Sequence, residues 1–466
     1  MSAIEEKERQ RVISAVPKAG VDGAVALARL DAKVIATVAA DTSQPWWRRR
    51  PCVLALRDRV PEGAIPPLWA RVIDKADVGE VRIATLDVLG AWWAGDPKRA
   101  VPSRERALDW LRGQNIDGQA YGMDQALVLA RCRLGDLEVV PALARLAFDP
   151  WHHRIRTAEQ ATAALLEARS LESVLGALGA ETVPQLVTSG ATAAARYFGL
   201  QRLAEGSADV ETLIEALGDR NVVVASRASR DLQALEVDDE RLLAVFDEHV
   251  ESLRRSSETG LARGGEAAAA AWALLAVARR IGPHGLPPLG DPECGERARA
   301  VHARLDLLEP FASSHPDVPD DVRRAILETY LPGERTTDPR LLLEGLRLGS
   351  REDDDEPENP DRVREALVAT GLEVGPPVTI GEVYRQGGGS YSVLDVGGVS
   401  VGVCTFGPFV RSEGALPASA VSAVECAGFR WIDEALASVV FEGLPVYFFG
   451  SREPLSVGDL LFYWQD

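Results

Sequence analysis

The chain has 466 residues, a length that corresponds to two to four ordinary domains or to one long repeat array with an added domain. Hydrophobic residues make up 46% and charged residues 26%, which excludes a globally disordered chain. The opening MSAIEEKERQRV lacks the basic start and apolar run of a signal peptide. The longest apolar stretch, residues 267–278, is shorter than the ~20 residues that cross a bilayer. We therefore expect a cytoplasmic protein that does not contact a membrane.

Charge is distributed unevenly along the chain. Residues 1–160 contain 24 Lys and Arg against 21 Asp and Glu, a net charge of +3. Residues 161–466 contain 27 against 49, a net charge of -22, which accounts for the total of -19. An acidic surface repels nucleic acid and attracts basic proteins, so this distribution predicts a partner protein with a basic surface and argues against nucleic acid. The alternative is that the acidity serves solubility alone.

Helical periodicity dominates residues 1–349, where apolar residues recur three and four apart and Gly, Asp or Pro separates short segments. Three segments resemble one another: 66–93, 140–166 and 210–235. Each has a turn with an Asp, which can cap the next helix, and an Arg and a small Ala early in that second helix. These positions are Asp77, Asp149 and Asp219 in the turns, and Arg82 with Ala84, Arg156 with Ala158 and Arg227 with Ala228 in the second helices.

The spacing of these segments indicates a repeat. The three alanines are 74 and 70 residues apart, about twice a period of 35–37 residues, and weaker copies near 125–133 and 191–203 fill the intervals. The motif Asp-x-x-x-(Val/Ile)-Arg-x-Ala, clearest at residues 77–84, resembles that of the HEAT-repeat family over residues 20–280. The third copy departs from it at residues 223–227. The resemblance implies a mainly α fold, an armadillo-like α-solenoid of HEAT-like helical hairpins over residues 1–349.

The last quarter of the chain has a different pattern. Helices are expected at 296–308, 320–330 and 339–346, and then a run of acidic residues and prolines at 350–360 predicts a linker. A short helix at 361–370 precedes a Val-, Tyr- and Gly-rich stretch, 377–410, that predicts strands and hairpins. A helix within 419–440 and strands at 445–450 and 455–464 complete a small α+β domain over residues 361–466.

Signatures of catalysis and metal binding are missing from the sequence. It contains no HExxH, GxSxG, Walker or GxGxxG motif, and its five scattered cysteines form no CxxC pair. Gly387, Gly388 and Gly389 predict a hairpin loop rather than a phosphate cradle, because no helix and Lys follow them. Adjacent helical residues such as His152 and His153 point about 100° apart and do not share a metal readily. The acidic residues 353–356 lack the turn glycine of a calcium loop. The sequence thus predicts no catalytic residue, no metal and no cofactor.

One constellation of residues suits recognition. Trp and Arg side chains together offer a large contact area, stacking and bidentate hydrogen bonds. We predict partner contacts on this basis, whereas Trp92 and Trp93 are expected to fill a repeat core. The candidate partner-binding residues are Trp46, Trp47, Arg48, Arg49, Arg50, Arg82, Trp151 and Arg156.

Three functions are compatible with these features. The favoured one is a non-enzymatic protein-binding scaffold or adaptor, in one version an inhibitor or immunity-type partner of a basic protein. The alternative resembles the HEAT-like DNA glycosylases that act on alkylated bases, with Asp87 or Asp124 as the acid, although the acidic charge opposes DNA binding. A third possibility resembles the HEAT-type lyases that attach a cofactor to a partner. Fold alone does not choose among them.

Overall fold

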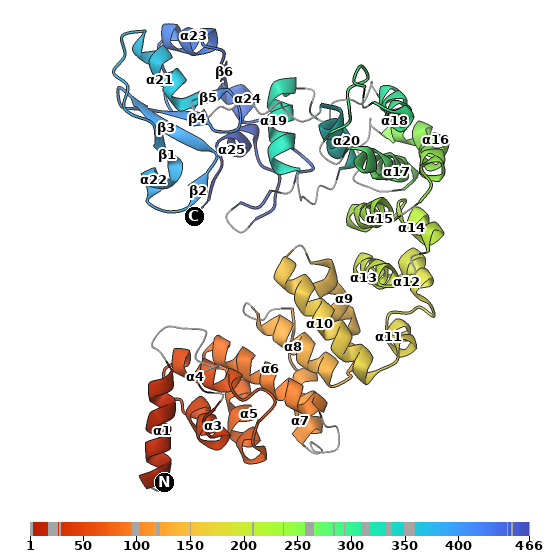
Figure 1. Ribbon diagram of the computed structural model, residues 1–466, viewed down its shortest axis with the longest axis vertical. Helices are drawn as coiled ribbons and strands as arrows, with labels where there is room; N and C mark the ends of the chain where they lie inside the picture. Colours follow the sequence, from red (N-terminus) through yellow and green to blue (C-terminus); the bar gives the residue numbers. More distant parts are fainter. Residues whose placement is uncertain are drawn as a thin grey trace. The chain divides into compact units, whose positions relative to one another are not determined.

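The chain is mainly helical, with a small sheet region near its C-terminus (Figure 1). Its residues form two compact units, which we call unit 1 (Met1–Ser207) and unit 2 (Ala208–Asp466). The structure is a computed structural model. It describes residues 3–16, 27, 29–95, 103–117, 122–149, 151–206, 209–235, 237–256, 265–282, 285–292, 294–308, 315, 317–331, 338–348, 359–444, 446–448 and 451–465.

The helices of unit 1 pack as pairs that follow one another along the chain (Figure 1). Four of them, α4, α6, α8 and α10, each pack on the helix before them, α3, α5, α7 and α9 respectively, and neighbouring members of these four also pack on one another. The bounds are α1 (Ala3–Ala15), α3 (Ala32–Ala40), α4 (Trp46–Leu54), α5 (Ile65–Ile73), α6 (Gly79–Gly95), α7 (Ser103–Arg112), α8 (Met123–Arg133), α9 (Val140–Phe148), α10 (His152–Ala168), α11 (Leu171–Ala177), α12 (Val183–Ser189) and α13 (Ala193–Ala204), with short 3-10 turns at Glu62–Ala64 and Leu137–Val139.

Arginines of α4 and α6 tie each of these helices to the helix before it. Arg49 Nε donates to the backbone oxygen of Ala39 at 3.2 Å, and Arg82 Nε donates to that of Val72 at 3.0 Å. Both bonds span ten residues and join the second helix of a pair to the C-terminal end of the first, where backbone oxygens lack helical partners. Ala84 is only 5% exposed, as expected where two helices approach closely.

The turn aspartates accept backbone N–H groups just before the second helices, but they are not the helix caps that the sequence predicted. The N-cap residues after Asp149 and Asp219 are Trp151, which makes no side-chain cap bond, and Asn221. Asp77 accepts the backbone N–H of Val78 at 2.8 Å, and Asp149 accepts that of Trp151 at 2.9 Å. Asp219 makes the equivalent bond to Asn221 at 2.7 Å. Each carboxylate satisfies a donor in the turn that leads into the second helix, where the first backbone N–H groups have no helical partner.

The helical part of unit 2 is built around α17 (Glu266–Ile281), which packs on helices to either side of it in sequence. Residues 267–278 are all buried, so the long apolar run is protein core. Within the described part of the chain, no helix combines the length and apolarity needed to cross a membrane. The other helices here are α14 (Val210–Ala216), α15 (Val222–Ala234), α16 (Asp239–Ser256), α18 (Glu296–Asp306), α19 (Asp320–Tyr330) and α20 (Pro339–Leu348).

The sheet region consists of a five-stranded sheet of order β1-β3-β4-β5-β6 and a separate pair, β2-β7. All neighbours are antiparallel except β5 and β6. Helices α21 and α23 pack together, and their apolar residues share a core with β3, β4 and β5. The bounds are β1 (Val378–Thr379), β2 (Gly388–Gly389), β3 (Tyr391–Val396), β4 (Val399–Cys404), β5 (Phe409–Ser412), β6 (Arg430–Trp431), β7 (Trp464–Gln465), α21 (Asn359–Val368), α22 (Ile380–Tyr384), α23 (Ala418–Cys426), α24 (Glu434–Ala437) and α25 (Val457–Leu461).

The sheet region is not packed independently of the helices before it. Val322 of α19 and Leu341 of α20 are fully buried in one cluster with Phe409 and Phe441. Residues 350–358 of the predicted linker lie outside the described residues, whereas Asn359 and Pro360 begin α21. The predicted helices at 296–308, 320–330, 339–346 and 361–370 correspond to α18, α19, α20 and α21.

The helix expected within 419–440 is confirmed as α23, which ends at Cys426, shortly before Gly428 turns the chain with φ 91°. One strand prediction nearby was wrong. The strand expected at 455–464 is mostly α25, with only Trp464 in β7. Ser456 and Asp459 form a reciprocal capping box that starts this helix, a local signal that outweighs the alternating pattern. In the strand expected at 445–450, Phe448 forms only an isolated bridge with Ser451, and residues 445, 449 and 450 lie outside the described part.

Two of the three clustered glycines lie in a strand rather than in a loop. Gly388 and Gly389 pair with Gln465 and Trp464 to form the β2-β7 ladder. A Cβ on Gly389 would lie 2.4 Å from Ile380 Cγ2 and 2.5 Å from the backbone oxygen of Tyr463, whereas a Cβ on Gly388 would meet nothing within 4 Å. Close packing therefore requires glycine at position 389 but not at position 388.

We expect Gly389→Ala to destabilise the β2-β7 pair by about 1–3 kcal/mol, because Ile380 and Tyr463 must move to admit the methyl group. Native-state hydrogen exchange of the strand amides measures this loss. Gly388→Ala is the matched control and should change protection by less than about 0.5 kcal/mol. Equal effects of the two substitutions would contradict the close approach.

Candidate functional site

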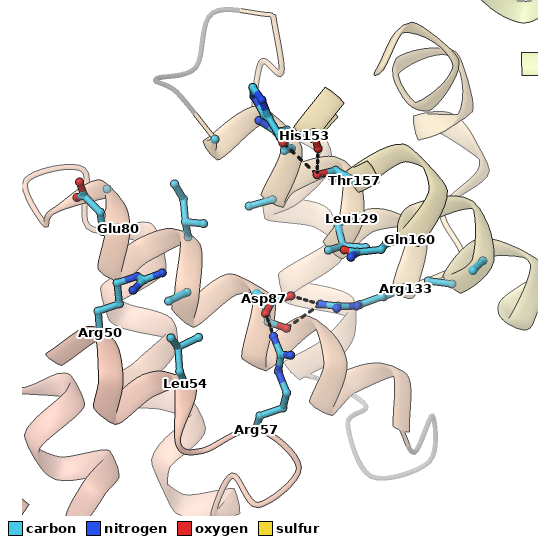
Figure 2. Close-up of a pocket in the computed structure, with 18 of the residues that line it drawn as sticks. Arg50, Leu54, Arg57, Glu80, Asp87, Leu129, Arg133, His153, Thr157 and Gln160 are labelled. Atoms are coloured by element: carbon cyan, nitrogen blue, oxygen red, sulfur yellow. Dashed lines mark hydrogen bonds and ion pairs between the residues drawn. The ribbon is translucent and has the colours of Figure 1, made fainter. Parts of the chain in front are cut away.

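A groove with a volume of about 1160 Å³ lies over α4, α6, α8 and α10 in unit 1 (Figure 2). Its lining residues recur three or four apart on each helix, so each helix contributes one stripe of its surface. The groove is thus one continuous face of four successive second helices. The stripes are Arg50, Leu54 and Arg57 from α4 and the turn after it, Glu80, Ile83 and Asp87 from α6, Gln125, Leu129 and Arg133 from α8, and His153, Thr157, Gln160, Ala164 and Glu167 from α10.

Small residues form much of the groove's surface. Their short side chains leave open space between the helices, and the larger aliphatic groups of Leu54, Ile83 and Leu129 add apolar area. Such a surface can accommodate side chains of a ligand without moving its own core. The small residues are Gly79, Ala84, Gly122, Ala126, Ala163 and Ala164.

An ion-pair cluster joins the middle of α6 to the C-terminal end of α8 and the turn after α4. Asp87 is shared by two guanidinium groups: Arg133 Nη1 lies 2.7 Å from its Oδ1 and also 2.7 Å from its backbone oxygen, and Arg57 Nη2 contacts its Oδ2. Figure 2 shows the two arginines reaching Asp87 from different sides. One carboxylate balances only one of the two positive charges, so the cluster carries a net charge of +1.

The other charged residues of the groove are differently placed. Arg50 is half-buried and has no hydrogen-bond or ion-pair partner among the residues that the structure describes. Glu80 and Glu167 are exposed. The unbalanced charge that is half-buried in the groove is therefore the positive charge of Arg50. The carboxylates of Glu80 and Glu167 lie in solvent.

Neutral polar groups complete the lining near α8 and α10. The Thr157 hydroxyl lies 3.0 Å from Gln125 Oε1 and 3.0 Å from the backbone oxygen of His153. Gln160 is exposed on the same stripe of α10. A side-chain amide offers both a donor and an acceptor, the same pair of groups that a peptide backbone presents.

The predicted partner-binding residues of α4 are divided between surface and interior. Trp46 is 44% exposed, and Arg48 stacks over the ring of Trp47 at 4.8 Å. Arg50 lines the groove, but Arg49 is 3% exposed and faces the interior. Adjacent helical positions point about 100° apart, so a run of three arginines cannot face one partner.

Arg49 forms a buried ion pair instead. Its two terminal nitrogens lie 2.8 and 2.5 Å from the carboxylate oxygens of Asp77, and the exposed fractions of the two side chains are 4% and 3%. Burial acts to raise the pKa of Asp77, but hydrogen bonds from Arg49 and from the backbone of Val78 outweigh it, so the pKa is lowered. The guanidinium of Arg49 joins α4 to the next helix pair and is not available to a partner.

The remaining predicted residues lie apart from the groove lining. Arg82 is half-buried and bonds to the backbone oxygen of Val72. Trp151 is 37% exposed, with its ring centroid 6.2 Å from that of His153. Arg156 is exposed on α10. Of the eight predicted residues, the structure brings only Arg50 into the groove.

Sequence reasoning does not find most of the groove. It gives no reason to select Arg57, Arg133, Gln125 or Gln160, and it considers Asp87 only as a glycosylase acid. One signal in the sequence could have found these residues. Each predicted second helix has, besides the apolar stripe that faces the first helix of its pair, another set of positions spaced three or four residues apart on a different face. The other acid considered, Asp124, is 8% exposed, lies 3.2 Å from Arg154 and does not line the groove.

The described residues contain no candidate metal site. No group of three or more His, Cys, Asp or Glu residues there could hold a metal ion. The acidic residues 353–356 lie outside the described part of the chain. The five cysteines are thiols rather than disulfide partners, and four of them are buried.

Comparison with known proteins adds no family to this description. The chain matches no model of a known protein family, and no curated protein matches it.

Proposed function

We propose that unit 1 is a HEAT-like α-solenoid whose groove holds an extended segment of a partner protein, and that the chain acts as a non-enzymatic scaffold or adaptor. The observation that carries this proposal is the mixed lining of the groove: aliphatic and small residues, amide side chains and charges of both signs. A nucleic-acid site would be dominated by cations, and an enzyme site would bring together titratable groups that are free to react.

The dimensions of the groove support an extended ligand. Packed helices lie about 8–10 Å apart, so four neighbouring helices span roughly 25–30 Å. An extended chain covers about 3.3 Å per residue, so some eight or nine residues would cross the groove. Gln125, Thr157 and Gln160 would bond to its backbone, and the spaces over the alanines would receive its side chains.

The charges of the two units support a basic region elsewhere on the partner. Unit 1 contains 27 Lys and Arg against 25 Asp and Glu, a net charge of +2, whereas unit 2 contains 24 against 45, a net charge of -21. A basic partner surface would be attracted to unit 2, as an inhibitor or immunity-type protein requires. We place this complex in the cytoplasm.

No observation favours the glycosylase alternative. That activity needs a carboxylate free to face the altered base, but Asp87 is bound by two arginines. Asp124 lies outside the groove lining.

Filling the groove should block ligand binding. Ala163 is exposed on the groove surface, so Ala163→Trp adds bulk there without altering the core. We expect dodecapeptides selected by display against the full chain to bind Ala163→Trp at least ten-fold more weakly than the unaltered protein, as fluorescence polarisation would measure. Ala177→Trp, at an exposed site on α11, is the control and should bind normally.

Two results would count against the proposal. One is that the selected peptides bind both tryptophan variants equally well. The other is that no peptide is enriched while duplex DNA containing an abasic or alkylated site binds at low salt, which would favour the glycosylase interpretation instead.

A further inference from the structure

We infer that the segment held in the groove is acidic, with one carboxylate facing Arg50 and another facing the Arg57–Asp87–Arg133 cluster, and with an aliphatic side chain between them. This inference rests on the proposed function and adds the chemical class of the ligand. It differs from the basic character expected of the partner's surface opposite unit 2, because it concerns only the segment inside the groove.

The first observation is the state of Arg50. A half-buried guanidinium has lost part of its hydration, and without an anion nearby that loss is not offset. No such anion is present among the described residues, and the carboxylate of Asp87 is already bound by two other arginines. A ligand carboxylate at this position would supply charge-assisted hydrogen bonds, which are about twice as strong as neutral ones.

The second observation is the surplus charge at the cluster. Arg133 is 18% exposed and uses only its Nη1 in the contacts with Asp87, and Arg57 uses only Nη2. Each guanidinium has five N–H donors, so donors remain on both arginines for a second carboxylate. An incoming anion would bring the cluster from +1 to neutral.

The arrangement of the two positive positions defines the ligand further. Arg50 and Arg57 lie at the α4 side of the groove, Arg50 on the helix and Arg57 in the turn after it, with Leu54 between them (Figure 2). An aliphatic ligand side chain would cover Leu54 and Ile83 and remove apolar surface from water. A polynucleotide would place further phosphates near Glu80 and Glu167 and would leave this apolar surface unused, so an acidic and aliphatic peptide fits better.

Three synthetic peptides test the inference. Each is a dodecapeptide with the same Leu and Ala positions, and the remaining positions are all Glu, all Gln or all Lys. We expect the Glu peptide to bind the full chain at least ten-fold more tightly than the Gln peptide in fluorescence polarisation at low ionic strength, and the Lys peptide to bind most weakly. Raising the salt concentration should reduce the preference for Glu.

Arg50→Gln tests whether the preference for Glu comes from a contact with Arg50 or from the overall charge of the protein. Arg50 has no partner within the described structure, so this substitution should leave thermal unfolding unchanged while reducing the Glu-over-Gln preference by at least three-fold. Arg106→Gln removes the same charge from an exposed position on α7 outside the groove lining and is the matched control. Equal losses from both variants would overturn the assignment to Arg50.

The remaining outcomes distinguish the two proposals. If the Gln or Lys peptide binds as tightly as the Glu peptide and Ala163→Trp still blocks it, the acidic preference is wrong and the peptide groove stands. If no peptide of any charge binds, the inference is wrong. If a single-stranded oligonucleotide of similar length displaces the Glu peptide and its binding depends on Arg50, both the inference and the peptide-binding function fail.

Discussion

Replacing Arg49 with methionine should lower the free energy of unfolding of the first helix pairs by about 3–5 kcal/mol. The substitution leaves the carboxylate of Asp77 buried without its main partner. The loss in free energy of unfolding should lie near the lower end of this range, because two groups still contact this carboxylate. They are Arg71 Nη1, at 3.5 Å, and the backbone N–H of Val78. Native-state hydrogen exchange of α3 to α6 in the full chain measures the effect.

The control for this prediction is an exposed ion pair in the same unit. Arg145 lies 3.0 Å from Asp117, and the exposed fractions of their side chains are 53% and 75%. Solvent screens such a pair, so Arg145→Met should cost no more than about 1 kcal/mol. Similar losses for the two substitutions would show that burial of the Arg49–Asp77 pair contributes nothing to the coupling of neighbouring helix pairs.

Trp93→Ala should produce a loss of similar size, about 3–5 kcal/mol, because it opens a large cavity between α5, α6 and α7. Trp93 is 1% exposed, and its ring meets that of Trp69 edge-on at 5.5 Å. Trp69 in turn meets Trp110 at 5.2 Å, so the cavity would also disturb a second aromatic contact. The loss of protection in hydrogen exchange should be largest for α5, α6 and α7.

Trp46→Ala provides the comparison at the surface. Its side chain is 44% exposed, so its removal should change stability by no more than about 0.5 kcal/mol. A large loss for Trp46→Ala together with a small one for Trp93→Ala would reverse the assignment of the two side chains to surface and core.

Sequence reasoning succeeded where a residue acts on its near neighbours along the chain. Asp77 accepts the backbone N–H of the next residue in the turn before α6, and Arg82 reaches back ten residues to Val72 within the same helix pair. Residue type and spacing along the chain predict such contacts. The same reasoning failed at residues 455–464, where the capping chemistry of Ser456 and Asp459 outweighed a longer alternating pattern.

Residue type and spacing did not predict which residues line the groove. Arg48, Arg49 and Arg50 are identical in type and adjacent in sequence, yet they stack on Trp47, pair with Asp77 and line the groove respectively. The contacts of each arginine depend on which neighbouring helix its side chain points toward. The packing of one helix pair on the next sets that neighbour. Arg57 and Arg133 are likewise distant in sequence and meet only because α4, α6 and α8 lie side by side.

Periodicity and composition were enough to predict helices over residues 1–349, a small sheet region after them and the difference in charge between the two. Both quantities are summed over individual residues and require no knowledge of distant contacts. Tertiary packing sets which arginine is buried, which has no partner among the described residues, and that α19 and α20 share a core with the sheet region. Those outcomes depend on contacts between residues distant in sequence, which the spacing of residues along one chain does not encode.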